Sequence, residues 1–534
     1  GERIKSAIRL TSQRYFMSPV EFIDNDTLKE RRMSQGRRHA VQPPLFVQTV
    51  EIYATIPQDP FYMRLATLVD WSFIYELTHD LYAPTMGRPS LDPVVFIKCL
   101  LFGFFEQVSE YRRLALRLAE SLTARRFLGY ALTEKTPDES TLRKTLALFP
   151  EEMFAAIFKQ ILAQCQTAGM LAGRHVGVDS TTVEAHASLD SLRHRTLGCT
   201  YREYECALRA TGEPAPTTMS NTDWVSPTDP DARVAKMKDG HIDLAYKVSI
   251  ATDLESGLVL GVDVTTAEVS DRHDLLPALD QACALLDALH APAPETVTAD
   301  KGYHDGATLA EVEALGITPF IRPPAPGRPS APGFAPTDFV RDAQSDALHC
   351  PAGHSLRRQP GDERHLPEGR QVYRAAGATC RACPHFGRCT TDRRGRKVYR
   401  SRDEGVLQAN ADRAHSLDAE TRFGARQTRG EAPFSYTKHG GRGRIRGRGL
   451  PVATKQTLLS YVGWNCVLLL KYLARAEALS PTLITGCNAL GQGIQRLYVV
   501  WSAYARRDRW PGRHSSIIFD NKISLHRYLS RFAA

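Results

Sequence analysis

The 534-residue chain lacks any uninterrupted apolar run of the roughly 18 residues that a membrane-spanning helix needs. Its most apolar stretches, 94–105 and 458–470, are interrupted by Lys98 and Asn465, which predicts buried helices instead. No secretory signal peptide is visible at the start of the sequence. Phosphate-binding Walker loops and Ser/His/Asp nucleophile arrangements are not evident either, so ATP-driven and acyl-transfer chemistry are unsupported. These absences favour a cytoplasmic protein without a membrane partner.

Positive charge is present in excess, but it is concentrated in one segment. The net charge is +9, and residues 391–455 hold 16 Lys/Arg against 7 Asp/Glu. The rest of the chain is therefore neutral overall. A concentrated basic stretch suits a polyanion, because each neutralised phosphate releases condensed counterions. A solvated basic face without a partner is the alternative.

The first third of the chain is dominated by helical patterns. Residues 1–80 are mixed and hard to place, whereas apolar spacing predicts helices over 94–105 and 110–121, and another that opens within 136–141. Ser90 and Asp92 are suited to cap the first of these helices. A helix-turn-helix that docks on DNA and a plain helical bundle both remain open for this region.

Short strands replace the helical pattern after Gly173. Strands are expected at 175–179, 243–253, 258–264, 295–299 and 318–321, with helices at 274–289 and 308–315. The strand at 175–179 ends in Asp179, and the strand at 295–299 is followed by Asp300. An open α/β arrangement brings such acids to one edge of the sheet. Six prolines between 323 and 336 then indicate a linker.

Two such acids and a third would make a site for divalent metal ions. Mg²⁺ prefers carboxylate oxygens and keeps waters that a substrate can displace. A pair of such ions activates the attacking oxygen and stabilises the leaving oxygen at a phosphodiester. An aspartate at a strand end, taken alone, more often caps a turn or a helix. The prediction that these aspartates bind metal therefore depends on the residues around them in the sequence.

That local sequence resembles a known family. The stretches around Asp179 (GVDSTTVEA) and Asp300 (TADKGY) resemble the first and second acidic motifs of bacterial insertion-sequence DDE transposases. The stretch from Arg426 to Asn465, which contains Glu431, resembles the third. Further short matches lie at 87–89, 136–141 and 226–233, so the resemblance covers roughly residues 85–475 in the expected order.

The resemblance implies an α/β, RNase H-like catalytic domain, an N-terminal all-α DNA-binding domain and a Cys-rich, zinc-type insertion. It implies that Asp179, Asp300 and Glu431 bind two Mg²⁺ or Mn²⁺ ions, with water and then a 3′-hydroxyl as nucleophiles. Glu420 and Glu404 are rivals for the third position. Glu431 is preferred because Lys438 lies seven residues further on, two helical turns away. Since Pro433 follows so closely, Glu431 must sit at or before the first turn of its helix.

The expected partner is DNA, as the terminal inverted repeats of the element and as target. Basic and aromatic residues near the second and third acids are predicted to contact it: Lys301, Tyr303, Arg426, Arg429, Lys438, Arg442, Arg444, Arg446 and Arg448. Structural pairing of these side chains with the acids is the alternative. A homodimer is expected, in a bacterial cytoplasm and associated with the nucleoid.

Four of the eleven cysteines form a separate pattern. Cys350, Cys380, Cys383 and Cys389 have the spacing C-x29-C-x2-C-x5-C, and a Cys-x-x-Cys knuckle with two further thiolates makes a tetrahedral Zn²⁺ site. His354 or His385 is a candidate to replace one thiol because the first gap is long. A closed site of this kind is structural. A disulfide pair or unliganded thiols is the alternative.

These patterns divide the chain into six predicted regions: 1–80 of uncertain structure, 81–168 helical and DNA-binding, 169–325 the first part of the catalytic core, 326–400 the Cys-rich insertion, 401–477 the second part of the core, and 478–534 a tail. The predicted function is metal-dependent DNA cleavage and strand transfer. An inactive DNA-binding descendant, or a metal-dependent nuclease without strand transfer, are the competing hypotheses.

Overall fold

The computed structural model describes residues 60–476, apart from 84–88, 109, 213–219, 238, 270–273, 325–333, 343, 364–365, 367–368 and 439–442. The chain divides into two compact units, Gly1–Leu470 and Lys471–Ala534. Only residues 471–476 of the second unit are described, and they are helical. All the other described residues belong to the first unit.

The N-terminal part of this unit is helical, as its apolar spacing predicts. Asp92 caps the most buried helix, α5, because its Oδ1 accepts hydrogen bonds from the amides of Val94 and Val95. Asp138 caps α8 in the same way through the amide of Thr141. The helices are α3 (Pro60–Leu68), α4 (Phe73–Thr78), α5 (Pro93–Phe105), α6 (Tyr111–Glu120), α7 (Leu122–Leu128), α8 (Glu139–Leu148) and α9 (Glu151–Thr167), with a short 3₁₀ turn at His79–Leu81.

A six-stranded mixed sheet follows, with the strand order β4-β5-β1-β7-β8 and with β6 also paired to β5. Strands β1 and β5 are antiparallel, whereas β1, β7 and β8 are parallel. The strands are β1 (His175–Glu184), β4 (Arg233–Lys236), β5 (Ile242–Asp253), β6 (Val259–Thr266), β7 (Thr296–Ala299) and β8 (Thr318–Ile321). The five expected strands are thus confirmed, and β4 is an addition that the sequence did not indicate.

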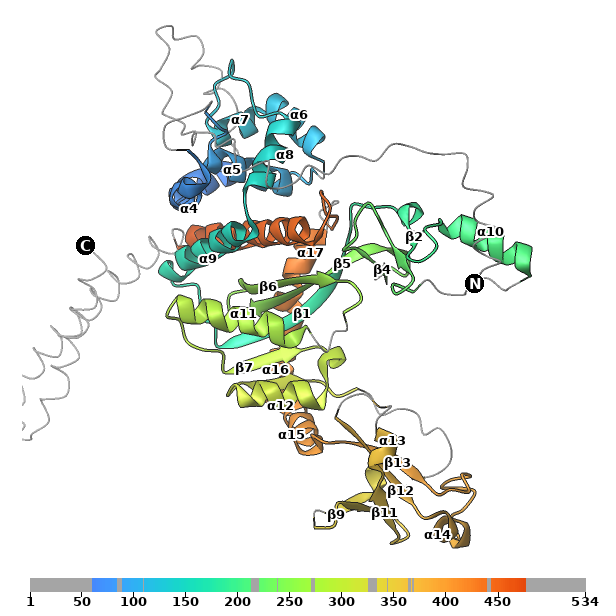
Figure 1. The fold of residues 1–534 in the computed structure, drawn as a ribbon. Coiled ribbons are helices and arrows are strands. Elements are labelled where there is room, and N and C mark those ends of the chain that lie inside the picture. Colours follow the sequence, from blue (N-terminus) through green and yellow to red (C-terminus); the bar gives the residue numbers. More distant parts are fainter. Residues whose placement is uncertain are drawn as a thin grey trace, which may run out of the picture. The chain divides into compact units, whose positions relative to one another are not determined.

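Helices pack on this sheet. Helix α11 (Leu275–Ala288) lies against β6, β5 and β1, and α12 (Gly306–Ala314) lies against β8 (Figure 1). Between β1 and β4 the chain forms a 3₁₀ turn at Leu189–Ser191, the small pair β2 (Arg193–His194) and β3 (Trp224–Val225), and α10 (Tyr201–Thr211). A capping box at Thr200 and Glu203 starts α10.

Two buried asparagines form hydrogen bonds that connect helices from the C-terminal part of the first unit to the sheet. Asn465 bonds both the amide and the carbonyl of Val259 on β6, and Asn410 does the same to Ile321 on β8. Asn465 belongs to the helix Leu450–Ala476, which alone in the described part of the chain is long and apolar enough to cross a membrane. Because 67% of its apolar stretch is buried inside the protein, it is built as a core helix.

The cysteine-containing region forms its own antiparallel sheet, in the order β13-β12-β11-β10-β9. Its core is separate and consists of Phe339, Leu348, Leu356, Tyr373, Ala375 and Val398. The elements are a 3₁₀ turn at Pro336–Asp338, β9 (Val340–Asp342), β10 (Ala347–His349), β11 (Ser355–Arg358), α13 (Pro360–Glu363), β12 (Arg370–Ala375), α14 (Gly377–Ala382) and β13 (Lys397–Ser401).

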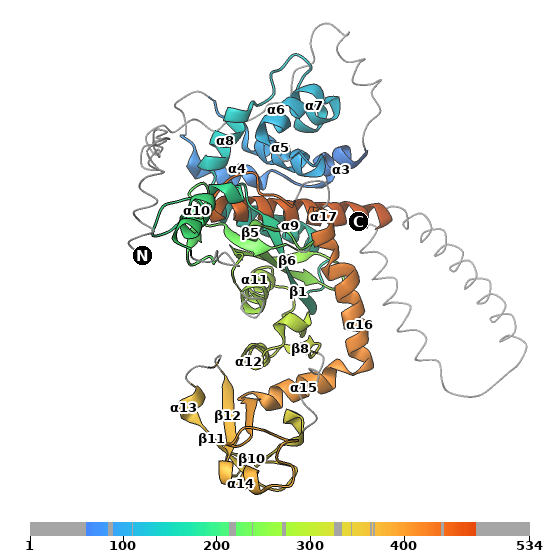
Figure 2. The same ribbon diagram turned by 90° about the vertical axis from the view of Figure 1, so that its right-hand side faces the viewer.

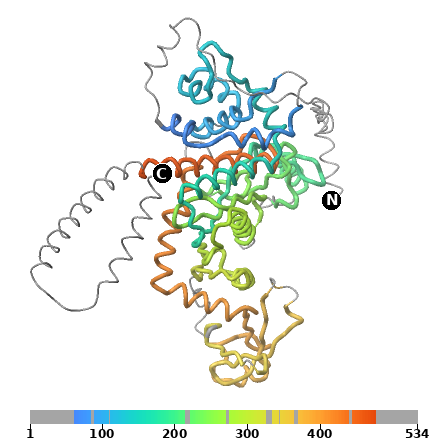
Figure 3. The backbone as a smooth tube through the Cα atoms, turned by 90° about the vertical axis from the view of Figure 1, so that its left-hand side faces the viewer, coloured from blue at the N-terminus to red at the C-terminus, as the bar shows by residue number. Residues whose placement is uncertain are grey.

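A run of helical segments returns the chain to the first sheet. It comprises α15 (Glu404–Ala414), α16 (Leu417–Ala425), a π-helix over Arg426–Gly430 and α17 (Ala432–Lys438). Figure 2 shows α15 and α16 as successive helices in orange that lead to α17. In Figure 3 the orange trace of α16 runs beside the green and yellow-green part of the chain, although the two are far apart in sequence.

Candidate active site

Asp179 and Asp300 lie side by side on neighbouring parallel strands. In the β1–β7 register His175 is opposite Thr296 and Gly177 is opposite Thr298, so continuing it by two residues places Asp179 beside Asp300. The expectation that Asp179 ends its strand is wrong. Strand β1 continues to Glu184 because it pairs with β5 along that whole length. It is β7 that stops at Ala299, so Asp300 follows the end of its strand whereas Asp179 lies within β1.

Glu431 reaches the same place from the helical run. It follows the π-helix and directly precedes α17, and its carbonyl accepts the amide of Ser435. Pro433 is tolerated because it lies in the first turn of α17, where a missing amide breaks no helical bond. A π-helix inserts an extra residue into the turn and occurs frequently at functional sites. The sequence-based position of Glu431 before the first turn is therefore correct.

The three carboxylates surround one guanidinium, that of Arg426. Its Nη1 lies 3.0 Å from Oδ2 of Asp179, and its Nη2 lies 3.4 Å from Oε1 of Glu431 and 4.0 Å from Oδ1 of Asp300. The side chain of Arg426 is 11% exposed, compared with 56% for Asp300 and 51% for Glu431. Three hard oxygen donors thus converge on a buried cation, which is the donor chemistry that suits a divalent metal ion.

The two rival acids are engaged elsewhere. Glu420 on α16 is paired with Arg322, 3.0 Å away, and Glu404 pairs with Arg400. Neither pair includes Asp179 or Asp300. Of the three candidates for the third acid, only Glu431 shares a cation with the two aspartates.

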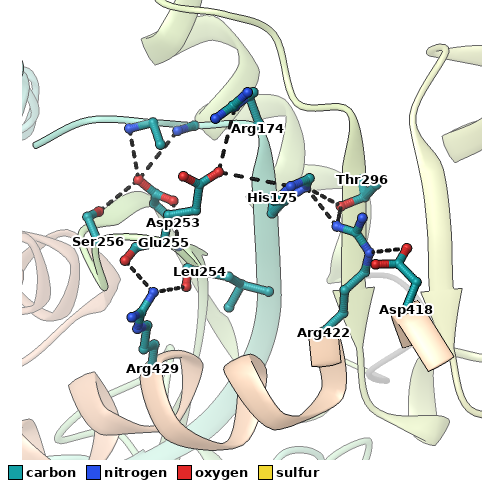
Figure 4. Close-up of polar contacts among 12 residues, drawn as sticks. Arg174, His175, Asp253, Leu254, Glu255, Ser256, Thr296, Asp418, Arg422 and Arg429 are labelled. Atoms are coloured by element: carbon teal, nitrogen blue, oxygen red, sulfur yellow. Dashed lines mark hydrogen bonds and ion pairs between the residues drawn. The ribbon is translucent and has the colours of Figure 1, made fainter. Parts of the chain in front are cut away.

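A network of polar contacts fastens the helical run to the strands behind the acids (Figure 4). Arg422 on α16 donates to Thr296 at 2.9 Å, lies 2.7 Å from Nδ1 of His175, and pairs with Asp418 at 2.9 Å. Arg429 donates to the carbonyls of Leu254 and Glu255 in the turn after β5. These bonds fix both ends of the segment that carries Arg426.

The helix Leu450–Ala476 closes the site from another side. Tyr461 on this helix is buried, and burial raises the pKa of its hydroxyl well above the ordinary value. A hydrogen bond with Thr437 lowers that pKa, and the negative charge of Asp179 raises it further. Asp179, at 19% exposed, therefore lies on the covered side of the site, near the buried Tyr461 hydroxyl, whereas Asp300 and Glu431 face the more open side.

The predicted DNA-contacting residues differ in how accessible they are. Lys301, Arg444 and Arg448 are exposed, and Lys438 is half-buried. Tyr303 is only 2% exposed and Arg446 only 9%, so both side chains pack inside this structure. Arg426 and Arg429 are held by the contacts described above. Arg442 lies outside the described residues.

The four cysteines of the pattern come together around one pocket. Cys350, Cys380, Cys383 and Cys389 line it, and so do His354 and His385. The amide of His354 points to Sγ of Cys350 at 3.3 Å, and the amide of Arg396 points to Sγ of Cys380 at 3.4 Å. Burial raises the pKa of the Cys389 thiol, Arg396 lowers it, and the other three thiols raise it. All four are free cysteines, so the disulfide alternative is not realised here.

A different group of ligand atoms was missed by the sequence analysis. Among the described residues, Glu184, His241 and Asp243 are the one group of at least three such side chains whose ligand atoms all lie within 4.8 Å of one another. They meet where β1 ends and β5 begins. The three acids around Arg426 and the four thiols are therefore spread more widely than this. Only the β1–β5 register, which pairs Glu184 with Ala245, brings the group together.

The motif at 226–233 also has a position that sequence alone did not reveal. Asp229 accepts hydrogen bonds from the hydroxyl of Tyr246 and from the amide of Gly449, 3.1 Å away. Asp231 accepts the amide of Leu450 at 2.9 Å. These carboxylates cap the amino end of the helix Leu450–Ala476, where negative charge is favourable. The motif therefore holds this helix against the sheet.

Comparisons with known proteins identify the family. A transposase domain model, DUF772, matches residues 50–147, and two models described as transposase DDE domains match residues 172–381 and 349–470. The chain belongs to the insertion-sequence DDE transposases. It is an enzyme of DNA transposition that cleaves DNA and transfers strands.

More distant comparisons add little. A solved piggyBac transposase synaptic complex with hairpin DNA is similar over 80% of this chain and 77% of that chain, with 8% sequence identity and a TM-score of 0.33. A TM-score this low does not establish a common fold. No curated protein matches the chain.

Proposed function

We propose that Asp179, Asp300 and Glu431 are the catalytic carboxylates of this transposase and hold two divalent ions, Mg²⁺ or Mn²⁺. The observation that carries this proposal is the convergence of the three acids on the Arg426 guanidinium. Bound metal ions would activate the attacking oxygen and stabilise the leaving oxygen at the phosphodiester. We further propose that the core is RNase H-like, which is supported by the antiparallel strands β1, β5 and β6, followed in the chain by β7 and β8, which run parallel to β1.

The chain's own residues account for the remaining requirements. In cleavage, a water oxygen forms a bond to phosphorus while the bond from phosphorus to the 3′-oxygen breaks. In joining, that 3′-hydroxyl forms a bond to a target phosphorus, and one target phosphodiester bond breaks. The number of phosphodiester bonds is unchanged by joining, so no external energy source is needed. Phosphoryl transfer of this kind asks the protein mainly for positioning and charge neutralisation.

We propose that DNA lies along the exposed basic side chains Lys301, Arg444 and Arg448, with Lys438 beside them. Their exposure supports this assignment. We place Tyr303 and Arg446 in packing roles because of their burial. The expected ligands are the terminal inverted repeats and target DNA. A homodimer and association with the bacterial nucleoid stay predictions, as does recognition of the repeats by the helical region.

We also propose that Cys350, Cys380, Cys383 and Cys389 bind one structural Zn²⁺. The shared pocket and the two amides that point to sulfur atoms support a knuckle geometry. Closed tetrahedral thiolate sites leave no open position for chemistry, so the ion would stabilise the insertion only. His354 and His385 lie at the same pocket and are the reserve ligands.

A strand-joining assay with pre-cut element ends and Mg²⁺ tests the catalytic assignment. We expect Asp179→Asn to reduce joining by about a thousandfold or more, because it removes a ligand of the site, while binding to the end DNA is retained. Asp287→Asn is the matched control, since Asp287 is an exposed residue on α11. Joining that survives Asp179→Asn would refute the site. Cleavage without joining by the unaltered protein would favour a nuclease.

A further inference from the structure

One arginine occupies the space between the three acids. Arg426 reaches Asp179 through Nη1 and Glu431 and Asp300 through Nη2. Three carboxylates carry three negative charges, and the guanidinium offsets one of them. Two negative charges are left without compensation, and the three acids do not gather as closely as the group at Glu184 does.

A guanidinium and a divalent ion cannot share this position. Arginine offers only N–H donors and has no lone pair for a metal, whereas Mg²⁺ needs carboxylate oxygens at about 2.0–2.1 Å. Two like charges at such short range also repel, and the guanidinium of Arg426, only 11% exposed, gains little screening from solvent. Metal binding at the three acids therefore requires Arg426 to leave.

The surroundings of Arg426 fit a side chain with two positions. Its backbone belongs to the π-helix, and a side chain at Gly430 would lie 3.3 Å from its Cγ, so the glycine leaves room for the stem. The neighbouring arginines differ, because Arg422 also bonds to Thr296 and His175 on the strands, and Arg429 bonds to backbone carbonyls in the turn after β5. Within the described part of the chain, the ion pairs of the Arg426 side chain are with the three acids themselves.

We infer that Arg426 is an internal counter-ion that competes with divalent metal for the three acids and is released toward a DNA phosphate. This inference rests on the proposed function. The displaced guanidinium needs an anionic partner, and a phosphate oxygen at the scissile bond is the one that the reaction brings. Metal binding and DNA binding then favour each other, because DNA provides the second position for Arg426.

The test measures the affinity of the full chain for Mn²⁺, with the electron paramagnetic resonance signal of free Mn²⁺ as the readout. Without DNA, Arg426→Met should bind Mn²⁺ roughly fivefold or more tightly than the unaltered protein. Arg426→Lys keeps the charge and should stay close to the unaltered protein. Arg413→Met removes a half-buried arginine that pairs with Glu313 on α12, and should leave the affinity unchanged. The loss of Mn²⁺ binding in Asp179→Asn shows how much of the binding is due to the three acids.

A second arm adds a DNA fragment that carries one element end. It should tighten Mn²⁺ binding to the unaltered protein more than to Arg426→Met. Equal or weaker Mn²⁺ binding by Arg426→Met without DNA would overturn the role of Arg426, provided that Asp179→Asn lowers the affinity. If Asp179→Asn has no effect on Mn²⁺ binding, the proposed metal site itself falls, and the inference falls with it.

Discussion

The two candidate metal sites of this transposase are built in opposite ways. The thiols come from a single stretch between Cys350 and Cys389 and rest on a small core of their own. The acids come from β1, from the residue after β7 and from the junction between the π-helix and α17, and they meet only when the strands pair in this register and the helical run docks on them. A site built from one short stretch can be predicted from the spacing of its residues in the sequence. A site built from distant segments forms only when the whole sheet is folded.

The largest expected effect is on the cysteine site and not on the acid site. Cys380→Ser should reduce bound zinc from about one ion per chain to near zero and open the sheet β9–β13 to protease. The physical reason is that closed thiolate sites supply about 10–16 kcal/mol of apparent binding energy to the domains they fold. Zinc content and limited proteolysis measure the outcome, with the exposed Cys206→Ser as the control. Negligible zinc in the unaltered protein, purified under reducing conditions, would contradict the proposal.

A smaller effect is expected on the stability of the sheet that carries the acids, without an effect on the zinc site. Asn465→Ala leaves the amide and the carbonyl of Val259 without their partner in a buried position, which costs about 2–4 kcal/mol of unfolding free energy. Urea denaturation measures this loss. Asn410→Ala is the matched comparison, because it removes the same two bonds at Ile321. Zinc content should stay constant in both variants, and a loss below about 0.5 kcal/mol would show that these bonds contribute little.

The smallest expected effect concerns pH beside the acid strand. Burial lowers the pKa of His186, and the charges of Arg444, Arg448 and Arg143 lower it further. The unfolded chain then binds more protons near and below pH 6.5, so stability is fully present above that pH and declines as the pH falls toward the folded-state value. Since His186 is only partly desolvated and its side chain still reaches solvent, the change should be about a few tenths of a kcal/mol.

His186→Gln should flatten this dependence between pH 7.5 and 5.5, as read from urea midpoints. DNA that neutralises Arg444 and Arg448 should flatten it as well. A dependence that persists unchanged in His186→Gln would assign the effect to other groups.

Much of the fold was predictable because it depends on short-range patterns. Alternation and turn residues gave β5 and β6, and the cap at Asp92 gave α5. What failed is also instructive. Asp179 was placed at a strand end, but its strand continues because β5 supplies partners up to Glu184. A strand's length depends on its neighbour, and a neighbour is not visible in the strand's own residues.

The sequence by itself determined the family, the two aspartate motifs, the cysteine pattern and the concentration of positive charge, because each is a matter of nearby residues. Only the tertiary structure decided that Glu431, and not Glu420 or Glu404, shares a cation with Asp179 and Asp300. It alone decided that Arg426 lies among the acids while Arg446 is buried. The reason is that long charged side chains choose partners by proximity in space, and proximity follows from sheet register and helix docking.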